Sequence, residues 1–280
     1  MTLATLADIL PAANREGRAV AGLVCLGWED AAAYAAAAEA AGQPAILQAG
    51  PGARAHMPVA VWAPMLRHLA ASVSVPIVVH LDHGRTIEDC REAIAAGFSS
   101  IMIDGSRLSF AENVAITREA VALAREAGVS CEGEIGFVGY SEGEVRAEVS
   151  APTDSEEAAR FVAETGVDAV AVSVGNVHLQ TESAATIGYG AVRALAEGVD
   201  VPLVMHGASG VSPRDRRRLA SEFPFAKFNV GTELRQVFGR SLRAGLAAHP
   251  DRFDRIAILR ETMGPLREGA ERVIRELAGA

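Results

Sequence analysis

The sequence is poor in several residue types, and each shortage excludes a class of protein. Its three cysteines, Cys25, Cys90 and Cys131, lie far apart and form no C-x-x-C pair, so neither a disulfide framework nor a thiolate metal site is indicated. No apolar run approaches the length of a membrane span. The formal net charge is −9, and an acidic protein gains no counterion release from nucleic acid or an anionic membrane. We therefore expect no nucleic acid and no membrane among its partners.

The first 17 residues lack the pattern of a secretion signal. They contain no basic segment, and Asp8, Asn14 and Arg15 interrupt what would need to be an apolar stretch. Together with the few cysteines, this favours a cytoplasmic protein. Of the 280 residues, 50% are hydrophobic, which allows a large core, and no break in composition divides the chain. We expect a single domain over residues 1–280.

Short apolar runs rich in β-branched residues alternate with longer segments of helical period. This alternation predicts parallel strands joined by helical crossovers. Eight repeats within about 250 residues match a closed (β/α)8 TIM barrel better than an open doubly wound sheet. We expect strands over 19–25, 45–48, 77–81, 100–103, 130–135, 169–174, 201–205 and 225–230. Helices are expected over 28–41, 59–72, 87–96, 110–127, 155–164, 189–196 and 213–222, with two or three extra helices over 234–280 that pack on the barrel or on another subunit.

The connection over residues 136–153 is unusually long for a compact barrel. It is polar and contains Gly136, Gly139 and Gly143. Long loops at the carboxyl ends of barrel strands are commonly lids over the active site. The alternative is a surface excursion without a function.

Three histidines follow three different expected strands at the end where barrels build their active sites. These are His83, His178 and His206. Three neutral imidazoles with an open fourth position form a common catalytic zinc site, so we predict Zn²⁺ bound by these residues. The alternative is that each is an ordinary core or rim histidine. His80, on the same strand as His83, is expected to support a ligand rather than to be one.

Carboxylates accompany these histidines. Asp82 shares a strand face with His80 and suits proton transfer or orientation of a substrate hydroxyl; the alternative roles are helix capping or orienting an imidazole. Glu132 and Glu134 share a face of the next-but-one strand. With Asp104 they would form a second cation site, hold the histidines in one tautomer, or pair with charges inside the barrel, and the sequence leaves these three readings open.

The last two strands end in turns of small residues. One turn contains Gly207 and Ser209, and the other contains Asn229, Gly231 and Thr232. Barrels most often bind phosphate at these two strand ends, so both turns are predicted phosphate sites.

These motifs resemble those of the class II, metal-dependent fructose-bisphosphate and tagatose-bisphosphate aldolase family. The resemblance covers residues 18–245. It is carried by the sequences HLDHG at 80–84, IMIDGS at 101–106, EN at 112–113, EIG at 134–136 with Glu142, GNVH at 175–178, HGASG at 206–210 and NVGT at 229–232.

The resemblance implies zinc on His83, His178 and His206, with Asp104 and Glu134 at a second metal or supporting the first. A second divalent cation or a monovalent cation would fit the same family pattern. It also implies that Asp82 handles the proton of the aldehyde oxygen and that Glu142 exchanges the proton of the ketose fragment. The remaining implied roles are substrate binding, by Asn229, and phosphate binding, by Gly207, Ser209 and Thr232. The reaction implied is cleavage of a ketose phosphate to dihydroxyacetone phosphate and an aldehyde, through an enediolate.

The sequence departs from the family pattern at several positions. Leu179 replaces a glycine and would narrow the turn that binds phosphate and a monovalent cation. Gly231 replaces the aspartate of fructose-type enzymes, which favours tagatose-type or other substrates over fructose 1,6-bisphosphate. Tyr140 and Gly143 alter the long loop, and Arg107 replaces a histidine and would meet an acidic or phosphorylated substrate tail.

Other functions compatible with the same residues are a non-catalytic accessory subunit of an aldolase and another metal-dependent lyase or epimerase. An aldolase that forms a Schiff base would need Lys227, the single lysine of the chain, and would leave the histidines unexplained. The expected partner is a small sugar phosphate, and the family implies a homodimer or homotetramer.

Overall fold

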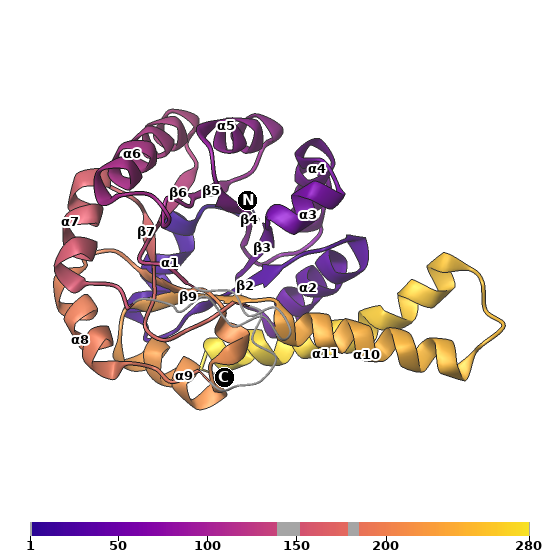
Figure 1. The fold of residues 1–280 in the computed structure, drawn as a ribbon. Helices are drawn as coiled ribbons and strands as arrows, with labels where there is room; N and C mark the ends of the chain where they lie inside the picture. The colour runs from indigo at the N-terminus through magenta and orange to yellow at the C-terminus, as the bar shows by residue number, and fades with distance from the viewer. Residues whose placement is uncertain (1, 139–151, 179–184, 280) are drawn as a thin grey trace.

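The computed structural model describes residues 2–138, 152–178 and 185–279, and it forms a closed parallel barrel (Figure 1). From β2 to β9 each strand pairs with the next, and β9 pairs with β2, which closes the ring. The predicted (β/α)8 barrel is therefore confirmed. Its strands are β2 (Val20–Val24), β3 (Ala45–Ala49), β4 (Ile77–Gly84), β5 (Ser100–Ile103), β6 (Ser130–Ile135), β7 (Ala169–Val172), β8 (Leu203–Met205) and β9 (Phe225–Val230).

Helices surround the barrel, and most begin and end as the sequence predicts because clear caps bound them. Ser109 caps α6, and Gly128 ends it in the left-handed conformation. The outer helices are α2 (Trp28–Ala41), α3 (Pro51–His56), α4 (Val59–Ala71), α5 (Ile87–Ala96), α6 (Phe110–Ala127), α7 (Ser155–Thr165), α8 (Tyr189–Gly198) and α9 (Pro213–Glu222). The strands expected over 169–174 and 201–205 are shorter than predicted. Pro202 has no N–H to donate, and β8 begins only at the residue after it.

The short strand β1 (Leu3–Ala4) and helix α1 (Leu6–Arg15), which were not predicted from the sequence, close the amino-terminal end of the barrel. The Thr5 hydroxyl accepts from the Asp8 N–H, and the Asp8 carboxylate accepts from the Thr5 N–H, so a capping box begins α1. Leu6 and Leu10 pack against Val78 and other small apolar side chains inside the barrel. The barrel interior is thus filled by apolar side chains at the end that α1 closes, and it is polar at the opposite end.

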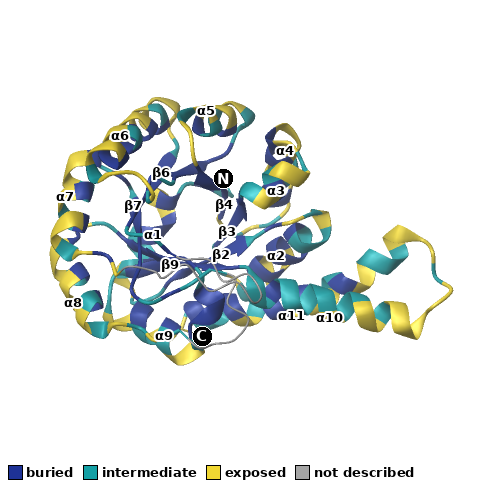
Figure 2. Cartoon of the chain, in the orientation of Figure 1, coloured by how far each residue is buried: buried dark blue, intermediate teal, exposed yellow. Residues whose placement is uncertain are grey.

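Two helices follow the last strand and form a long hairpin that extends away from the barrel (Figure 1). They are α10 (Thr232–Ala248) and α11 (Arg255–Leu277), as the prediction of two or three helices allowed. The base of the hairpin is mostly of intermediate exposure and packs on α2, whereas its tip is exposed (Figure 2). In the described part of the chain, no helix is long and apolar enough to cross a membrane.

Candidate metal centre and active site

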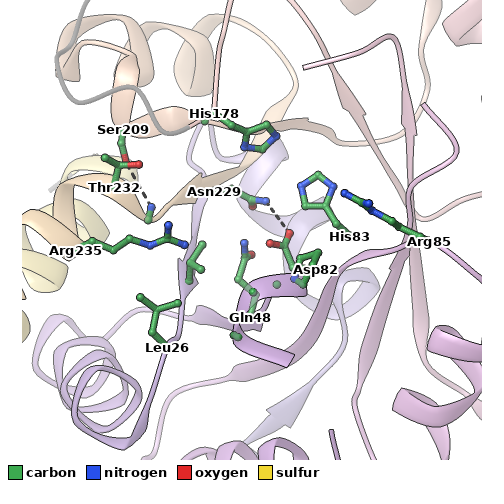
Figure 3. A pocket seen from close by; sticks show the side chains of 17 residues that line it. Leu26, Gln48, Asp82, His83, Arg85, His178, Ser209, Asn229, Thr232 and Arg235 are labelled. Carbon is green, nitrogen blue, oxygen red and sulfur yellow. Dashed lines mark hydrogen bonds between the residues drawn. The ribbon is translucent and has the colours of Figure 1, made fainter. Parts of the chain in front are cut away.

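The predicted site residues gather at the carboxyl ends of the strands, around a cavity of about 360 Å³ (Figure 3). Asp82 and His83 come from the end of β4, and Asn229 comes from β9. Further lining residues from the predicted set are His178, Gly207, Ser209, Gly231 and Thr232. Residues separated by as many as 150 positions meet here because all parallel strands of a barrel end at one rim.

The three histidines form a compact cluster. The ring centroids of His83 and His206 are 4.7 Å apart, those of His83 and His178 are 5.2 Å apart, and those of His178 and His206 are 5.6 Å apart. One ring nitrogen from each lies within 4.8 Å of the others, which is the spacing that a shared metal ion requires. The structure therefore brings together all three predicted zinc ligands.

His83 reaches this cluster through an irregularity at the end of β4. The pairing of β4 with β5 shifts between Leu81 and Gly84, and His83 has a φ of 50°, in the left-handed region that non-glycine residues rarely adopt. Arg54 of α3 stabilises this backbone by donating to the carbonyl oxygens of Asp82 and His83 at 2.6 and 3.0 Å. Without the shift, strand alternation would direct Asp82 and His83 to opposite faces. Sequence reasoning missed the role of Arg54.

Asp104 and Glu134 lie against His83 and form a second potential ligand group with it. Asp104 Oδ2 is 2.9 Å from His83 Nδ1, and Glu134 Oε2 is 3.6 Å from the same nitrogen. Burial and the neighbouring charge of Asp104 raise the pKa of Glu134 well above its usual value. This clustering of carboxylates is compatible with both the second-cation and the supporting role.

Glu132 has a different environment from Glu134. Its carboxylate accepts from the Lys227 ammonium at 2.6 Å and lies 3.0 Å from His206 Nε2. Lys227 Nζ also lies 3.2 Å from His80 Nε2, and all four side chains are fully buried. Glu132 therefore pairs with a charge inside the barrel and holds one tautomer of His206, which leaves His206 Nδ1 to face the cluster.

The protonation states of the cluster suit metal binding. Burial, followed by the charge of His83, lowers the pKa of His178 and of His206 well below the usual value, so both imidazoles are neutral at pH 7. Burial also acts to lower the pKa of His83, but the charge of Asp82 and the hydrogen bond with Asp104 outweigh it and raise this pKa to about 9. A cation would take the place of that proton.

Two buried polar atoms in the cluster support a metal ion. His206 Nδ1 and Glu134 Oε2 face each other at 3.4 Å, and neither has a hydrogen-bond partner among the described residues. Buried polar atoms without partners are costly, whereas a cation between them satisfies both. Imidazole nitrogens with a carboxylate oxygen are a donor set that Zn²⁺ accepts, so the residues present fit the ion implied by the sequence.

Asp82, Asn229 and Gln48 line the cavity beside the histidines. Asn229 Nδ2 donates to Asp82 Oδ1 at 3.2 Å, while both polar atoms of the buried Gln48 amide and Asn229 Oδ1 have no hydrogen-bond partner in the described part of the chain. A Cβ atom at Gly22 would lie 2.6 Å from Gln48 Oε1, so glycine there allows both amides to face inward. Gln48 was missed in the sequence, where a single glutamine in an apolar strand is not distinctive.

The small-residue turns meet at the start of α10. Ser209 Oγ accepts from the N–H groups of Gly231 and Glu233 at 3.3 Å each. Gly207 has a φ of 62°, and a Cβ there would lie 2.3 Å from the Val177 carbonyl oxygen, so only glycine fits. These turns therefore line the cavity at a helix N-terminus, the arrangement that binds phosphate. Arg235, one turn into α10, also lines the cavity and was not predicted.

Five residues named from the sequence lie outside the described residues, as does most of the connection over 136–153 that was expected to be a lid. They are Glu142, predicted to exchange the proton, Gly139 of the same connection, and the three departures Tyr140, Gly143 and Leu179.

A parallel barrel with a candidate metal site and small-residue turns at one rim is the architecture of a metal-dependent barrel enzyme. The chain belongs to the class II fructose-bisphosphate aldolase family, whose model, described as "Fructose-bisphosphate aldolase class-II", matches residues 4–280. The protein is therefore an aldolase, a carbon–carbon lyase, and the resemblance inferred from the motifs is confirmed.

Individual relatives agree with this family. The chain is 35% identical over 279 residues to a probable fructose-bisphosphate aldolase of Bacillus subtilis, covering 98% of this chain and 95% of that protein. It is 38% identical over 208 residues to a 6-phospho-5-dehydro-2-deoxy-D-gluconate aldolase of Shouchella clausii, covering 74% of this chain and 70% of that protein. The crystal structure of the YdjI aldolase of Escherichia coli K12 matches with a TM-score of 0.84 at 29% identity, covering 98% of this chain and 97% of that one.

Proposed function

We propose that this aldolase depends on Zn²⁺ and cleaves or forms a ketose phosphate, with dihydroxyacetone phosphate as the phosphorylated product. The observation that carries the proposal is the convergence of His83, His178 and His206 in a cavity that the small-residue turns also line. A divalent cation held by these histidines would supply a Lewis acid to the oxygens of the ketose. The turns and the N-terminus of α10 would bind the phosphate.

Asp82 and Glu142 would carry the two proton transfers. In cleavage, Asp82 accepts the proton of the hydroxyl that becomes the aldehyde while the adjacent carbon–carbon bond breaks, and Glu142 returns a proton to the carbon left on the ketose fragment. Asn229, which donates to Asp82 Oδ1, fixes the orientation of that carboxylate. Asp82 lines the cavity, and a Cβ at Gly50 would lie 3.2 Å from its second oxygen, Oδ2.

The substrate is a phosphorylated ketose, and the family does not specify the half of the ketose that is released as the aldehyde. Relatives are named for fructose bisphosphate and for 6-phospho-5-dehydro-2-deoxy-D-gluconate, both of which carry phosphate. Gly231, where fructose-type enzymes have aspartate, favours a tagatose-type or other ketose phosphate over fructose 1,6-bisphosphate. An accessory subunit is disfavoured, because a scaffold has no reason to keep an assembled metal-ligand cluster. Cytoplasmic location stays a prediction from the sequence.

The test is release of dihydroxyacetone phosphate from a panel of ketose 1-phosphates and 1,6-bisphosphates. The protein is assayed as purified, after treatment with a chelator, and after zinc is restored. We expect release that the chelator abolishes and zinc restores. No release from the zinc-loaded protein with any member of the panel would contradict the proposal.

Glu142→Gln separates metal binding from proton transfer. We expect the variant to keep its zinc and to lose about 100-fold or more of the rate at which dihydroxyacetone phosphate exchanges its carbon-bound proton with solvent. NMR in deuterated water measures the exchange. Glu148→Gln, the same charge change six residues further along, is the control and should exchange normally; equal exchange in both variants would remove Glu142 from this role.

We also propose that the protein forms a homodimer or homotetramer through the α10–α11 hairpin. At the hairpin tip, Phe253 is 94% exposed and Ile256 is 67% exposed, and apolar side chains of this size on a projecting element are typical of an interface. Light scattering measures the mass in solution. A mass of 29.2 kDa, that of one chain, would contradict the proposal.

A further inference from the structure

A buried arginine joins the three helices that follow the last two strands of the barrel. Arg216 of α9 is 3% exposed, and its guanidinium lies between two carboxylates, those of Glu233 on α10 and Glu276 on α11. Figure 1 shows α9 beside the bases of α10 and α11. Arginine is almost never buried unless it is paired, and Arg216 does not line the cavity, so its contacts within the protein explain its position.

The contacts of Arg216 divide between the two carboxylates. One terminal nitrogen, Nη1, donates to Glu233 Oε2 at 3.2 Å, and the other, Nη2, donates to Glu276 Oε2 at 3.4 Å. Nε lies 2.9 Å from Glu276 Oε1 as an ion pair outside hydrogen-bond geometry. Burial raises the pKa of Glu233, the charge of Arg216 opposes this, and the charge of Glu276 adds to it. Arg216 therefore separates two carboxylates that would otherwise repel each other.

Glu233 connects this ion-pair group to the turns that are predicted to bind phosphate. It is the second residue of α10, directly after Thr232, and its N–H donates to Ser209 Oγ at 3.3 Å. Ser209 belongs to the turn after β8, which leads into α9 through the cap residue Ser212. Figure 3 shows Ser209 and Thr232 next to each other at the cavity wall. Arg216 thus joins the helix that follows one turn to the helix that follows the other.

We infer that Arg216 is a positioning residue for the substrate phosphate, because it holds the first turn of α10 against the turn after β8. The inference rests on the proposed function, which assigns the phosphate to these two turns. Without the guanidinium, Glu233 and Glu276 would be buried like charges without a partner, and their repulsion would displace the start of α10. A misplacement of about 1 Å is enough to reduce the efficiency of a site by about 100-fold.

The experiment compares two ligands that differ only by a phosphate. Glycolohydroxamate binds zinc through its two hydroxamate oxygens, and its phosphate ester adds the group that the turns would bind. Calorimetry of the zinc-loaded protein gives the Kd of each ligand and requires no turnover. For Arg216→Met we expect the Kd of the phosphate ester to rise by about 10-fold and that of glycolohydroxamate to change by less than about twofold.

Three further variants identify the cause. Arg216→Met/Glu233→Gln removes one of the two carboxylate charges and should recover part of the loss, to a Kd of the phosphate ester about threefold above that of the wild type. Arg216→Lys keeps the charge without the paired donors and should also weaken binding of the phosphate ester by about threefold. Arg217→Met, the same substitution at an exposed position of α9, should bind both ligands as the wild type does.

The ratio of the two Kd values separates positioning of the phosphate site from support of the fold. The same ratio in the wild type and in Arg216→Met, whether or not both Kd values change, overturns the inference alone. If Arg216→Met does not fold, the wild-type ratio in both Arg216→Lys and the double variant overturns it. A wild type that gains no affinity from the phosphate, or that binds neither ligand, contradicts the proposed function and this inference with it.

Discussion

His206→Ala is expected to lose its bound metal and its aldolase activity together. His206 supplies one of the three clustered imidazoles, and its Nδ1 faces Glu134 Oε2 at 3.4 Å without a hydrogen bond in the described structure. Two histidines cannot complete the arrangement of three protein ligands that catalytic zinc sites use. The zinc content after desalting, measured by elemental analysis, should fall from about one zinc per chain to near zero. The rate of dihydroxyacetone phosphate release should fall in parallel.

A thermal shift provides a readout that does not depend on turnover. Zinc at about 100 times its Kd should stabilise the metal-free wild type by about 2.7 kcal/mol and His206→Ala by much less. His178→Ala, at a less buried position of the same cluster, should lose the stabilisation by zinc as His206→Ala does. His249→Ala, on the exposed loop after α10, should be stabilised as much as the wild type. Full zinc content and stabilisation in His206→Ala would remove this residue from the metal site.

Lys227→Met is expected to destabilise the metal-free protein by about 3–5 kcal/mol, because it leaves Glu132 buried without its cationic partner. The ammonium and the carboxylate are 2.6 Å apart and neither is exposed to solvent. Since Glu132 also holds His206 Nε2 at 3.0 Å, zinc affinity should fall by about 10- to 100-fold as well. Urea unfolding of the metal-free protein and competition with a zinc indicator measure the two effects.

The double variant Lys227→Met/Glu132→Gln tests whether the buried charge is the cause. It removes the unpaired carboxylate and should recover most of the lost stability but not the zinc affinity, because the amide no longer holds His206 as the carboxylate does. A double variant no more stable than Lys227→Met would contradict this explanation.

Sodium borohydride, which reduces a Schiff base and thereby inactivates an enzyme that forms one, tests whether Lys227 acts as a nucleophile. Added with dihydroxyacetone phosphate, it should leave the wild type active, because the Lys227 amine is engaged with Glu132 rather than free to form a Schiff base.

Local sequence patterns were sufficient for most of the fold. The helices over 28–41, 87–96, 110–127 and 213–222 have the predicted bounds, since caps and glycine stops are encoded by a few adjacent residues. α1 was missed although Thr5 and Asp8 form a capping box, and α3 was missed because its six residues are too few to show a helical period. β7 ends two residues earlier than predicted because strand length also depends on pairing partners, and β8 begins two residues later than predicted because Pro202 has no N–H to donate.

The sequence by itself determined the family, the alternation that makes a barrel, and which histidines and carboxylates meet, because each follows a strand and a parallel barrel brings all strand ends to one rim. Only the tertiary structure decided how these side chains divide their roles. Glu132 and Glu134 are two residues apart on one strand face, yet Lys227 engages the first and the histidine cluster faces the second. The shift in the pairing register of β4 that turns His83 inward depends on Arg54 and on pairing with β5, and neither is adjacent to His83 in the sequence. Such choices are set by packing between distant segments, which local patterns do not encode.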